Sequence, residues 1–193
     1  MAVAFDNTVA SILFNKRAKI PNEPGTDSPI ALARERLEKL VLDLQKSKDQ
    51  IVIATPVIAE LLTVTGPDGI EYFNAIARSK VFEIADFDSK AALEVSFLNA
   101  VALADGDKKD GIDAPWQKIK VDRQIIAICK VKNVHTLYTD DVGLAKTATR
   151  VGIRAVGIHE LPFPASEAQG NFLSDLEPNP DEEGGDDQRQ ATD

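Results

Sequence analysis

Short β-rich runs alternate with longer helical patterns along this chain, and the alternation constrains its fold more than any other feature. The runs are AVAF from residue 2, IVIA from 51, VFEI from 81, TLYT from 136 and IRAV from 153, with at least one candidate helix between neighbours. Parallel strands need helical crossovers of this kind, whereas antiparallel hairpins do not. The sequence therefore predicts an α/β fold with a mainly parallel sheet.

One helical pattern is clearer than the others. Apolar residues recur at spacings of three and four from Ser28 to Lys46, and Pro29 suits the first turn of such a helix. The preceding segment, KRAKIPNEPGTDSP, is rich in Pro, Gly and charge, which indicates an exposed loop near the first strand. A second surface loop is expected from Ala104 to Pro115, ahead of the helix that Asp122 starts.

Charge is distributed unevenly along the chain. Residues 162–193 contain nine Asp or Glu and one Arg, whereas residues 1–161 contain 22 acidic and 21 basic residues. The 193-residue chain is long enough to bury a core, but its charged end lacks the apolar groups that would offset the entropy of ordering. We expect one folded domain over 1–161 and a disordered acidic tail over 162–193. Because the folded part is nearly neutral, a nucleic-acid partner is permitted.

The sequence predicts a cytoplasmic protein without a membrane span. Asp6 and Asn7 interrupt the apolar N-terminal stretch, and Lys16 and Arg17 follow that stretch rather than precede it, contrary to a secretory signal. No apolar run approaches the roughly 18 residues that cross a bilayer. The single cysteine, Cys129, falls in a helical pattern as a small buried hydrophobe, so disulfides play no part.

Acidic residues stand where the predicted strands end. Asp6 follows the first strand, Glu60 lies one turn into the helix after the second, and Asp140 and Asp141 follow the fourth. Asp122 belongs to a further helix. Because the carboxyl ends of parallel strands meet at one edge of a sheet, we expect these five residues to converge there.

Several carboxylates cannot share such an edge as bare anions without raised pKa values or a cation. A divalent metal would resolve that conflict, and oxygen ligands alone favour Mg²⁺ or Mn²⁺. The two histidines, His135 and His159, lack the spacing of a zinc site and are interpreted as surface or helix-end residues. The sequence therefore predicts a magnesium or manganese site.

Each acidic residue also has a structural explanation. Aspartate is a preferred N-cap residue. Taken one at a time, the aspartates at positions of this kind are more often caps than metal ligands, and this applies to Asp6, Asp122 and Asp140. Asp88 is expected to cap the helix that begins SKAALEV. Glu60 resists this account, because Thr55 and Pro56 resemble the cap and first residue of its helix, and a capping-box glutamate would then stand at position 58.

Four segments together resemble the PIN-domain family of nucleases, in the family's order. They are AFDNTV around Asp6, IATPVIAELL around Glu60, VDRQIIAIC around Asp122 and TLYTDDVGLAKTA around Asp141. One such motif alone is weak, whereas four in order form a more specific signal that runs from the first residue to about Ile158. In the last segment the family's acid stands two residues after a Thr or Ser, which selects Asp141 and keeps Asp140 as a close second.

The resemblance implies a three-layer α/β/α PIN-like fold with a central parallel sheet of about five strands, and cleavage of RNA phosphodiester bonds with Mg²⁺ or Mn²⁺. Its implied catalytic and metal-binding acids are Asp6, Glu60, Asp122 and Asp141, with Asp140 as a further metal ligand. Many bacterial members are VapC-like toxins held inactive by an antitoxin, so an antitoxin protein and a homodimer are implied partners. The long loop after the first helix and the acidic tail depart from the family's pattern, which leaves the toxin assignment weaker than the nuclease one.

Side chains near the acids could assist them. Asn7, Thr8 and Thr139 could orient a carboxylate or a water molecule, and a cap or turn contact explains them equally well. Candidates for phosphate contacts are Lys16, Arg17, Lys19, Lys118, Lys120 and Arg123, although for most of them a solvated surface charge is the safer default.

Three other classes of protein compete with this interpretation. Haloacid-dehalogenase-like phosphatases need a second Asp two residues after the first, where this chain has Thr8, and receiver domains need an acidic pair near the first strand. The remaining alternative is a non-catalytic PIN-like module that binds RNA or protein and uses its acids as caps. A metal titration distinguishes this module from the nuclease.

Overall fold

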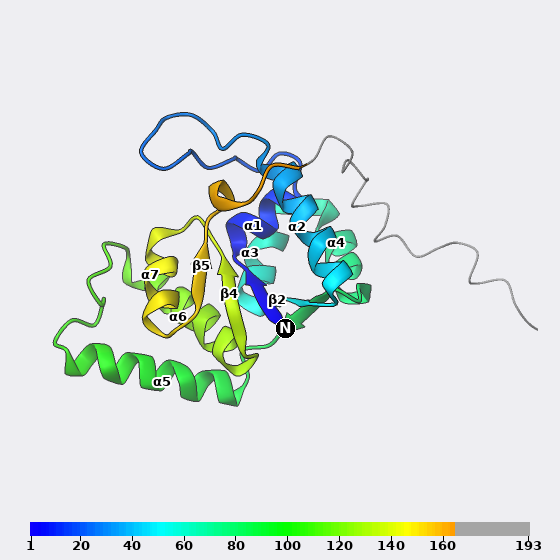
Figure 1. The fold of residues 1–193 in the computed structure, drawn as a ribbon. Coiled ribbons are helices and arrows are strands. Elements are labelled where there is room, and N and C mark those ends of the chain that lie inside the picture. Colours follow the sequence, from blue (N-terminus) through cyan, green and yellow to red (C-terminus); the bar gives the residue numbers. More distant parts are fainter. Residues whose placement is uncertain (165–193) are drawn as a thin grey trace, which may run out of the picture.

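A computed structural model describes residues 1–164, in which five parallel strands form one sheet in the order β3-β2-β1-β4-β5 (Figure 1). The strands are β1 (Ala2–Phe5), β2 (Gln50–Ala54), β3 (Phe82–Ala85), β4 (Val134–Tyr138) and β5 (Arg154–Val156). The α-helices are α1 (Asn7–Phe14), α2 (Ala33–Ser47), α3 (Thr55–Thr65), α4 (Gly69–Arg78), α5 (Ser89–Ala104), α6 (Trp116–Val131) and α7 (Val142–Arg150). Two 3₁₀ turns complete the elements, η1 (Gly66–Asp68) and η2 (Ile158–Glu160).

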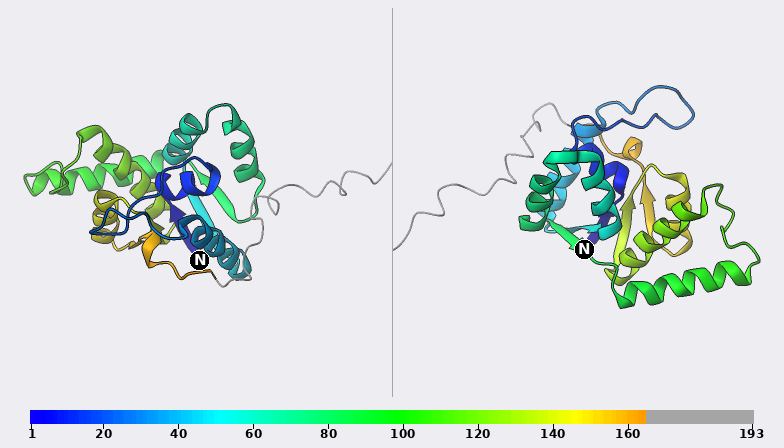
Figure 2. Two further views of the ribbon diagram at one scale, coloured as in Figure 1. Left: turned by 90° about the horizontal axis from the view of Figure 1, so that it is seen from above. Right: turned by 180° about the vertical axis from the view of Figure 1, so that it is seen from behind.

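The helices form two layers, one on each face of the sheet (Figures 1 and 2). Helices α1 to α4 connect β1, β2 and β3 on one face, and α5, α6 and α7 lead back to β4 and β5 on the other. Right-handed crossovers produce this arrangement when the chain reverses its direction across the sheet. The predicted three-layer α/β/α fold with a parallel sheet is confirmed. The reversal falls between β1 and β4, which pair directly, and the crevice at such a switch point is where open α/β sheets bind ligands.

The central strands are apolar and buried on both faces. Residues 3–5 of β1 and 51–54 of β2 are all at most 2% exposed, because helices cover both sides of the sheet. Phe5 makes edge-to-face contacts with Phe82 and Tyr138, at centroid distances of 6.4 and 5.6 Å. This packing fixes the ends of β1 and β4, and therefore the residues that follow them.

The first residues of the helix predicted from Ser28 belong, in the structure, to the loop before α2. Instead, Pro29 forms an isolated antiparallel bridge with Asn22, and the Ile30 N–H donates to the Pro21 carbonyl at 2.9 Å. These backbone contacts close the loop on itself, so α2 begins at Ala33 and ends at Ser47. The predicted start of this helix was wrong by five residues, while its end was wrong by one.

Two other helix starts differ from the prediction. Helix α6 begins at Trp116 after Pro115, so Asp122 lies within the helix and does not start it. Helix α3 begins at Thr55 itself, with Ala54 at the N-cap, and the Thr55 hydroxyl instead accepts from the Phe87 N–H at 3.1 Å. By contrast, the prediction that Asp88 caps α5 is confirmed, because its carboxylate accepts from the Ala91 N–H at 2.9 Å.

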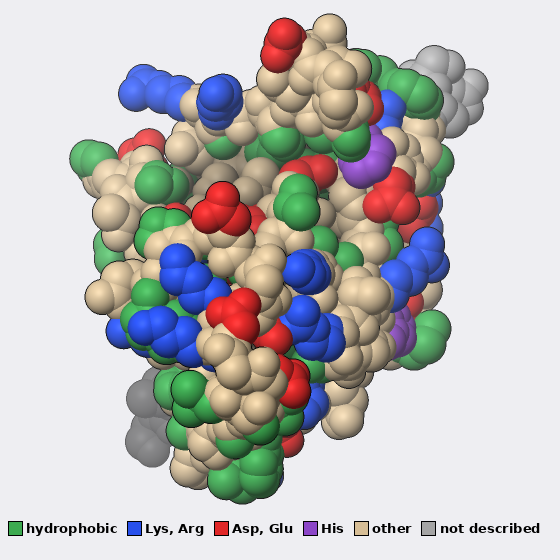
Figure 3. All heavy atoms as spheres, turned by 90° about the vertical axis from the view of Figure 1, so that its left-hand side faces the viewer, with side chains coloured by type: hydrophobic (Ala, Val, Ile, Leu, Met, Phe, Trp, Pro, Cys, Tyr) green, Lys and Arg blue, Asp and Glu red, His purple; other side chains and the backbone are tan. Residues whose placement is uncertain are grey.

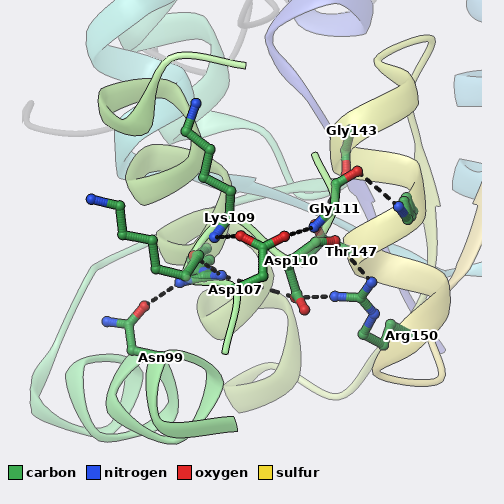
Figure 4. Close-up of polar contacts among 11 residues, drawn as sticks. Asn99, Asp107, Lys109, Asp110, Gly111, Gly143, Thr147 and Arg150 are labelled. Atoms are coloured by element: carbon green, nitrogen blue, oxygen red, sulfur yellow. Dashed lines mark hydrogen bonds and ion pairs between the residues drawn. The ribbon is translucent and has the colours of Figure 1, made fainter. Parts of the chain in front are cut away.

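The loop between α5 and α6 is tied to α7 (Figure 4). Arg150 forms an ion pair with Asp110 and donates to its carbonyl, and Lys146 donates to the carbonyl of Gly111 at 3.0 Å. Arg123 of α6 is buried and donates to Asn99 and to the carbonyl of Lys108. These contacts fix the position at which α6 begins. They also commit the Arg123 guanidinium to the protein itself, so the predicted phosphate contact by Arg123 was wrong.

The last described residues pack against α2. Arg36 is buried and donates to the carbonyls of Ile158, His159 and Leu161, and its guanidinium lies 3.9 Å from the centroid of the Phe163 ring. The acidic tail predicted over 162–193 falls, from residue 165 onward, outside the described residues. Within residues 1–164, none of the helices combines the length and the apolar character that a bilayer crossing requires.

Candidate functional site

A cavity of about 400 Å³ opens where β1 and β4 end, and four of the five predicted acids line it. Asp6 follows β1, Asp141 follows β4, Glu60 comes from α3, and Asp122 comes from α6. Acidic and basic side chains intermix on the face shown in Figure 3. The convergence predicted from the strand ends is therefore present for these four residues.

Asp6 is held by both of its carboxylate oxygens. Its Oδ1 accepts from the Val9 N–H at 2.8 Å and caps α1, and its Oδ2 accepts from the Thr139 hydroxyl at 2.5 Å. The side chain is 3% exposed. Burial raises the pKa of Asp6 to about 7, against the lowering effect of the Thr139 and Val9 hydrogen bonds. Asp140 and Asp141 add like-charge repulsion. Asp6 therefore exchanges its proton near neutral pH.

Thr139 connects the two strand ends. Its hydroxyl donates to Asp6 and accepts from the backbone N–H of Asp141 at 3.0 Å. A buried hydroxyl that both donates and accepts has little freedom to rotate, so it sets the relative positions of the two acids. This contact gives a physical reason for the spacing in which Asp141 stands two residues after a threonine.

Asp141 both caps a helix and faces the cavity. Its Oδ1 accepts from the Leu144 N–H at 2.9 Å at the start of α7, and its Oδ2 lies 2.8 Å from the ammonium of Lys118. Although burial opposes it, the combined effect of Lys118 and the helix N–H groups lowers the pKa of Asp141. Capping and cation binding are thus compatible in this residue.

Lys118 also contacts Asp122, one turn later in α6, at 2.6 Å. Its ammonium therefore lies between the carboxylates of Asp122 and Asp141 and acts as an internal counter-cation. Burial nevertheless raises the pKa of Asp122, and the two carboxylates raise the pKa of Lys118 despite its partial burial. The sequence predicted Lys118 as a phosphate contact or a solvated surface charge, although its i,i+4 spacing to Asp122 was the available signal for an ion pair.

Glu60 lies differently from the aspartates. It is exposed on α3, and within residues 1–164 its carboxylate has no hydrogen bond or ion pair. No capping or packing role explains its position on the cavity wall. Its carboxylate is free to turn toward a ligand, at the entropic cost of fixing a mobile side chain.

Asp140 lines a neighbouring cavity of about 330 Å³ rather than the one shared by the other acids. Its Oδ1 accepts from the Ile158 N–H at 3.1 Å and lies 3.8 Å from His159 Nδ1. Burial raises the pKa of Asp140. Asp141 lines both cavities, so between the two candidates for the last acid the geometry favours Asp141.

The donor set of the first cavity suits a hard divalent cation in its chemistry, because carboxylate oxygens are the ligands that Mg²⁺ and Mn²⁺ prefer. Asp122 and Asp141 already hold one positive charge, the Lys118 ammonium. Within residues 1–164, no three Asp, Glu, His or Cys side chains are gathered closely enough to hold a metal ion as they stand. A metal would therefore have to displace Lys118 and draw the acids together.

Cys129 is excluded as a reactive group. It is fully buried in α6, and burial raises the pKa of its thiol to about 12. The prediction of a small buried hydrophobe is confirmed.

No family model and no curated protein matches this sequence. Among solved structures, the fold is similar to VapBC2 from Rickettsia felis bound to a DNA fragment from their promoter. The identity is 17% and the TM-score is 0.49, over 81% of this chain and 98% of that chain. A similarity at this level carries no argument about activity, so the function is inferred from the site itself.

Proposed function

We propose that this chain is a metal-dependent endoribonuclease that hydrolyses RNA phosphodiester bonds at the cavity between β1 and β4. One observation carries the proposal: acids from four separate segments, Asp6, Glu60, Asp122 and Asp141, line a single cavity at the switch point of a parallel sheet. Helix caps at strand ends would also gather at this edge, as Asp6 and Asp141 do, but Glu60 and Asp122 lie inside α3 and α6 and cap neither helix. RNA as the substrate follows from the sequence resemblance.

Asp122 and Asp141 would hold Mg²⁺ or Mn²⁺ in place of the Lys118 ammonium, with Asp6 and Glu60 completing the negative wall. The bound ion supplies a Lewis acid that lowers the pKa of a water molecule and stabilises charge on the leaving oxygen. Without such an ion, the wall would repel the phosphates of RNA.

Asp6 would have a separate role, which is to take up and release a proton. Its pKa of about 7 leaves it partly protonated at neutral pH, and a cation nearby favours its ionised form. Thr139 keeps the Oδ2 atom of Asp6 oriented during this exchange. Cation binding is therefore expected to release a proton from Asp6, which calorimetry in buffers of different ionisation enthalpy can count.

The decisive variant is Glu60→Gln. Because the Glu60 carboxylate has no hydrogen bond or ion pair in the described part of the chain, the substitution should leave the melting temperature unchanged. It should lower Mn²⁺-dependent cleavage of single-stranded RNA at least about 100-fold, as expected when a charged group in the site is lost. Fully retained cleavage by purified Glu60→Gln protein would contradict the proposed role.

Asp6→Asn provides the second variant, with Asp88→Asn as its matched control. Both aspartates cap a helix through one Oδ atom, at 2.8 and 2.9 Å, and Asn preserves a cap of this kind. Of these two aspartates, Asp6 lines the cavity and Asp88 does not, so Asp6→Asn should abolish cleavage and Asp88→Asn should not. If no metal supports cleavage and Mn²⁺ does not raise the melting temperature of the unmodified chain, the non-catalytic binding module becomes the better interpretation. Pairing with an antitoxin stays a prediction of the sequence resemblance.

A further inference from the structure

A second cavity lies beside the acid-lined one and has no part in the proposed hydrolysis. Its volume is about 330 Å³, within the range of about 300 to 1,000 Å³ that small-ligand sites occupy. The loop between α1 and α2, the start of α7, the end of β5 and η2 form its walls, and Figure 1 shows the loop in blue on the same side of the molecule as η2 in orange. Because this loop departs from the family's pattern, the cavity is a feature of this chain.

Hydrogen bonds hold the walls of this cavity in place. In the loop, the Glu23 N–H donates to the Ser28 carbonyl at 2.8 Å. At η2, the Arg36 guanidinium donates to the His159 carbonyl at 2.9 Å. Gly157 leaves room for the imidazole, because a Cβ atom at this position would lie 2.6 Å from His159 Nδ1. The cavity is therefore formed in advance, and a ligand would not have to order it.

The lining combines apolar walls with acidic groups. Its charged side chains are Asp140, Asp141 and Glu160, joined by His159, and no Lys or Arg of residues 1–164 lines the cavity. A phosphate group would therefore be repelled. The apolar side chains that line it are those of Pro21, Pro24, Val142, Ala145, Ala155 and Val156. Such a cavity suits a flat, uncharged group that carries N–H donors.

Two polar atoms of the lining residues have no hydrogen bond. Within residues 1–164, Asp140 Oδ2 and His159 Nδ1 are buried and lack a partner of this kind, whereas Asp140 Oδ1 accepts from the Ile158 N–H at 3.1 Å. A buried polar atom without a hydrogen bond destabilises the folded chain. A ligand that brings N–H donors would remove this cost for Asp140 after a small rotation of its side chain.

We propose that this cavity binds a guanine base of the RNA substrate, with the Asp140 carboxylate accepting from the N1–H and the 2-amino group of the base. This inference rests on the proposed function, because the base belongs to the RNA that the chain would cleave. Guanine presents two neighbouring N–H donors on its Watson–Crick edge, which match the two oxygens of a carboxylate. Adenine and cytosine place a ring-nitrogen acceptor beside their amino group, and uracil places carbonyl oxygens beside its N–H, so a carboxylate disfavours all three. Proteins recognise unpaired RNA bases through such edges.

The position of the cavity agrees with a role in choosing the cleavage site. Asp141 lines both cavities, so a nucleotide whose base is bound here lies next to the acids that would hold the metal. Val142 lines the second cavity and is 83% exposed, which leaves an apolar side chain available to contact the face of a base. Cleavage should therefore occur at a fixed spacing from a guanine.

NMR of the histidine side chains tests base binding separately from cleavage, with the full chain and without metal. The chain has two histidines, and His135 lies on β4 and lines neither cavity, so its signals are an internal reference. Guanosine should shift the His159 signals in a saturable manner, with a dissociation constant of about 1 mM or tighter, and leave those of His135 unchanged. Inosine lacks the 2-amino group and should bind about tenfold more weakly, because one hydrogen bond to a charged group is lost.

Ala145→Leu should fill the cavity from α7 and weaken guanosine binding at least about tenfold. Ala77→Leu is the matched control, because it makes the same exchange at an exposed position of α4 that lines neither cavity, and binding should persist. The absence of a His159 shift at about 1 mM guanosine, or equal shifts with adenosine, cytidine and uridine, would overturn the proposal whether or not the chain cleaves RNA. Guanosine binding by a chain that cleaves no RNA would support the base site and contradict the nuclease.

Discussion

Replacing Asp6 by Asn should make the free energy of unfolding depend less on pH. The pKa of Asp6 rises from 3.8 to about 7 on folding, because the carboxylate leaves water for a buried position. One pKa unit corresponds to about 1.4 kcal/mol, so ionisation of Asp6 in the folded protein costs at most about 4 kcal/mol of stability. Asn carries no ionisable proton, and it keeps the cap of α1.

The sign of the effect follows from proton binding. Between about pH 4 and pH 7 the folded chain holds a proton on Asp6 that the unfolded chain has released. The stabilising contribution of that proton is complete below pH 4 and is lost as the pH rises through 7. The variant lacks this loss. The stability of Asp6→Asn relative to the unmodified chain should therefore increase from pH 4 to pH 8, by on the order of 3 kcal/mol.

Urea unfolding of both proteins at half-unit pH steps, without divalent metal, measures this difference. Asp88→Asn shows what the same exchange contributes at an exposed cap. A difference between Asp6→Asn and the unmodified chain that stays constant from pH 4 to pH 8 would refute the reasoning, because it would mean that Asp6 titrates alike in the folded and unfolded chain.

Further predictions concern the contacts around the cavity and the chain end. Lys118→Met should raise the affinity for Mn²⁺ about tenfold in calorimetric titration, because the metal no longer displaces an ammonium from Asp122 and Asp141; an unchanged or weaker affinity would show that Lys118 does not compete. Thr139→Val should lower the unfolding free energy by about 1 to 3 kcal/mol in urea, since it removes a buried hydrogen bond to Asp6. Arg36→Ala should cost about 2 to 3 kcal/mol by the same assay, because three carbonyls lose their donor; a loss below about 0.5 kcal/mol would indicate that water replaces the guanidinium.

The fold was largely predictable because periodicity and strand spacing are local properties of the sequence. All five strands fall within two residues of their predicted starts, as apolar runs bounded by polar residues indicate. Helix starts were less predictable, because they depend on contacts made elsewhere. Pro29 was expected in the first turn of α2, but its backbone belongs to a bridge with Asn22, and no local signal reveals that bridge.

The candidate site was predictable as a set of residues but not as a network of contacts. Strand ends and topology predicted that Asp6, Glu60, Asp122, Asp140 and Asp141 would meet, and all of them but Asp140 line the same cavity. The geometry that separates Asp141 from Asp140 depends on side-chain directions one residue apart, which the sequence does not contain. The ion pairs of Lys118 were missed because a lysine before an acid in a helix is also typical of a solvated surface.

The pairing of β1 with β4 has a consequence for how the protein is made. Ala2 to Phe5 leave the ribosome well before one of their two neighbours in the sheet, the strand Val134–Tyr138, which is synthesised more than 120 residues later. Until that strand inserts, the early strands present an open edge and the cavity lacks the wall that Thr139 and Asp141 provide. A nascent chain therefore holds only half of the site, and any hydrolytic capacity arises after the distant segments have found each other, a slow step because of the loop that must close.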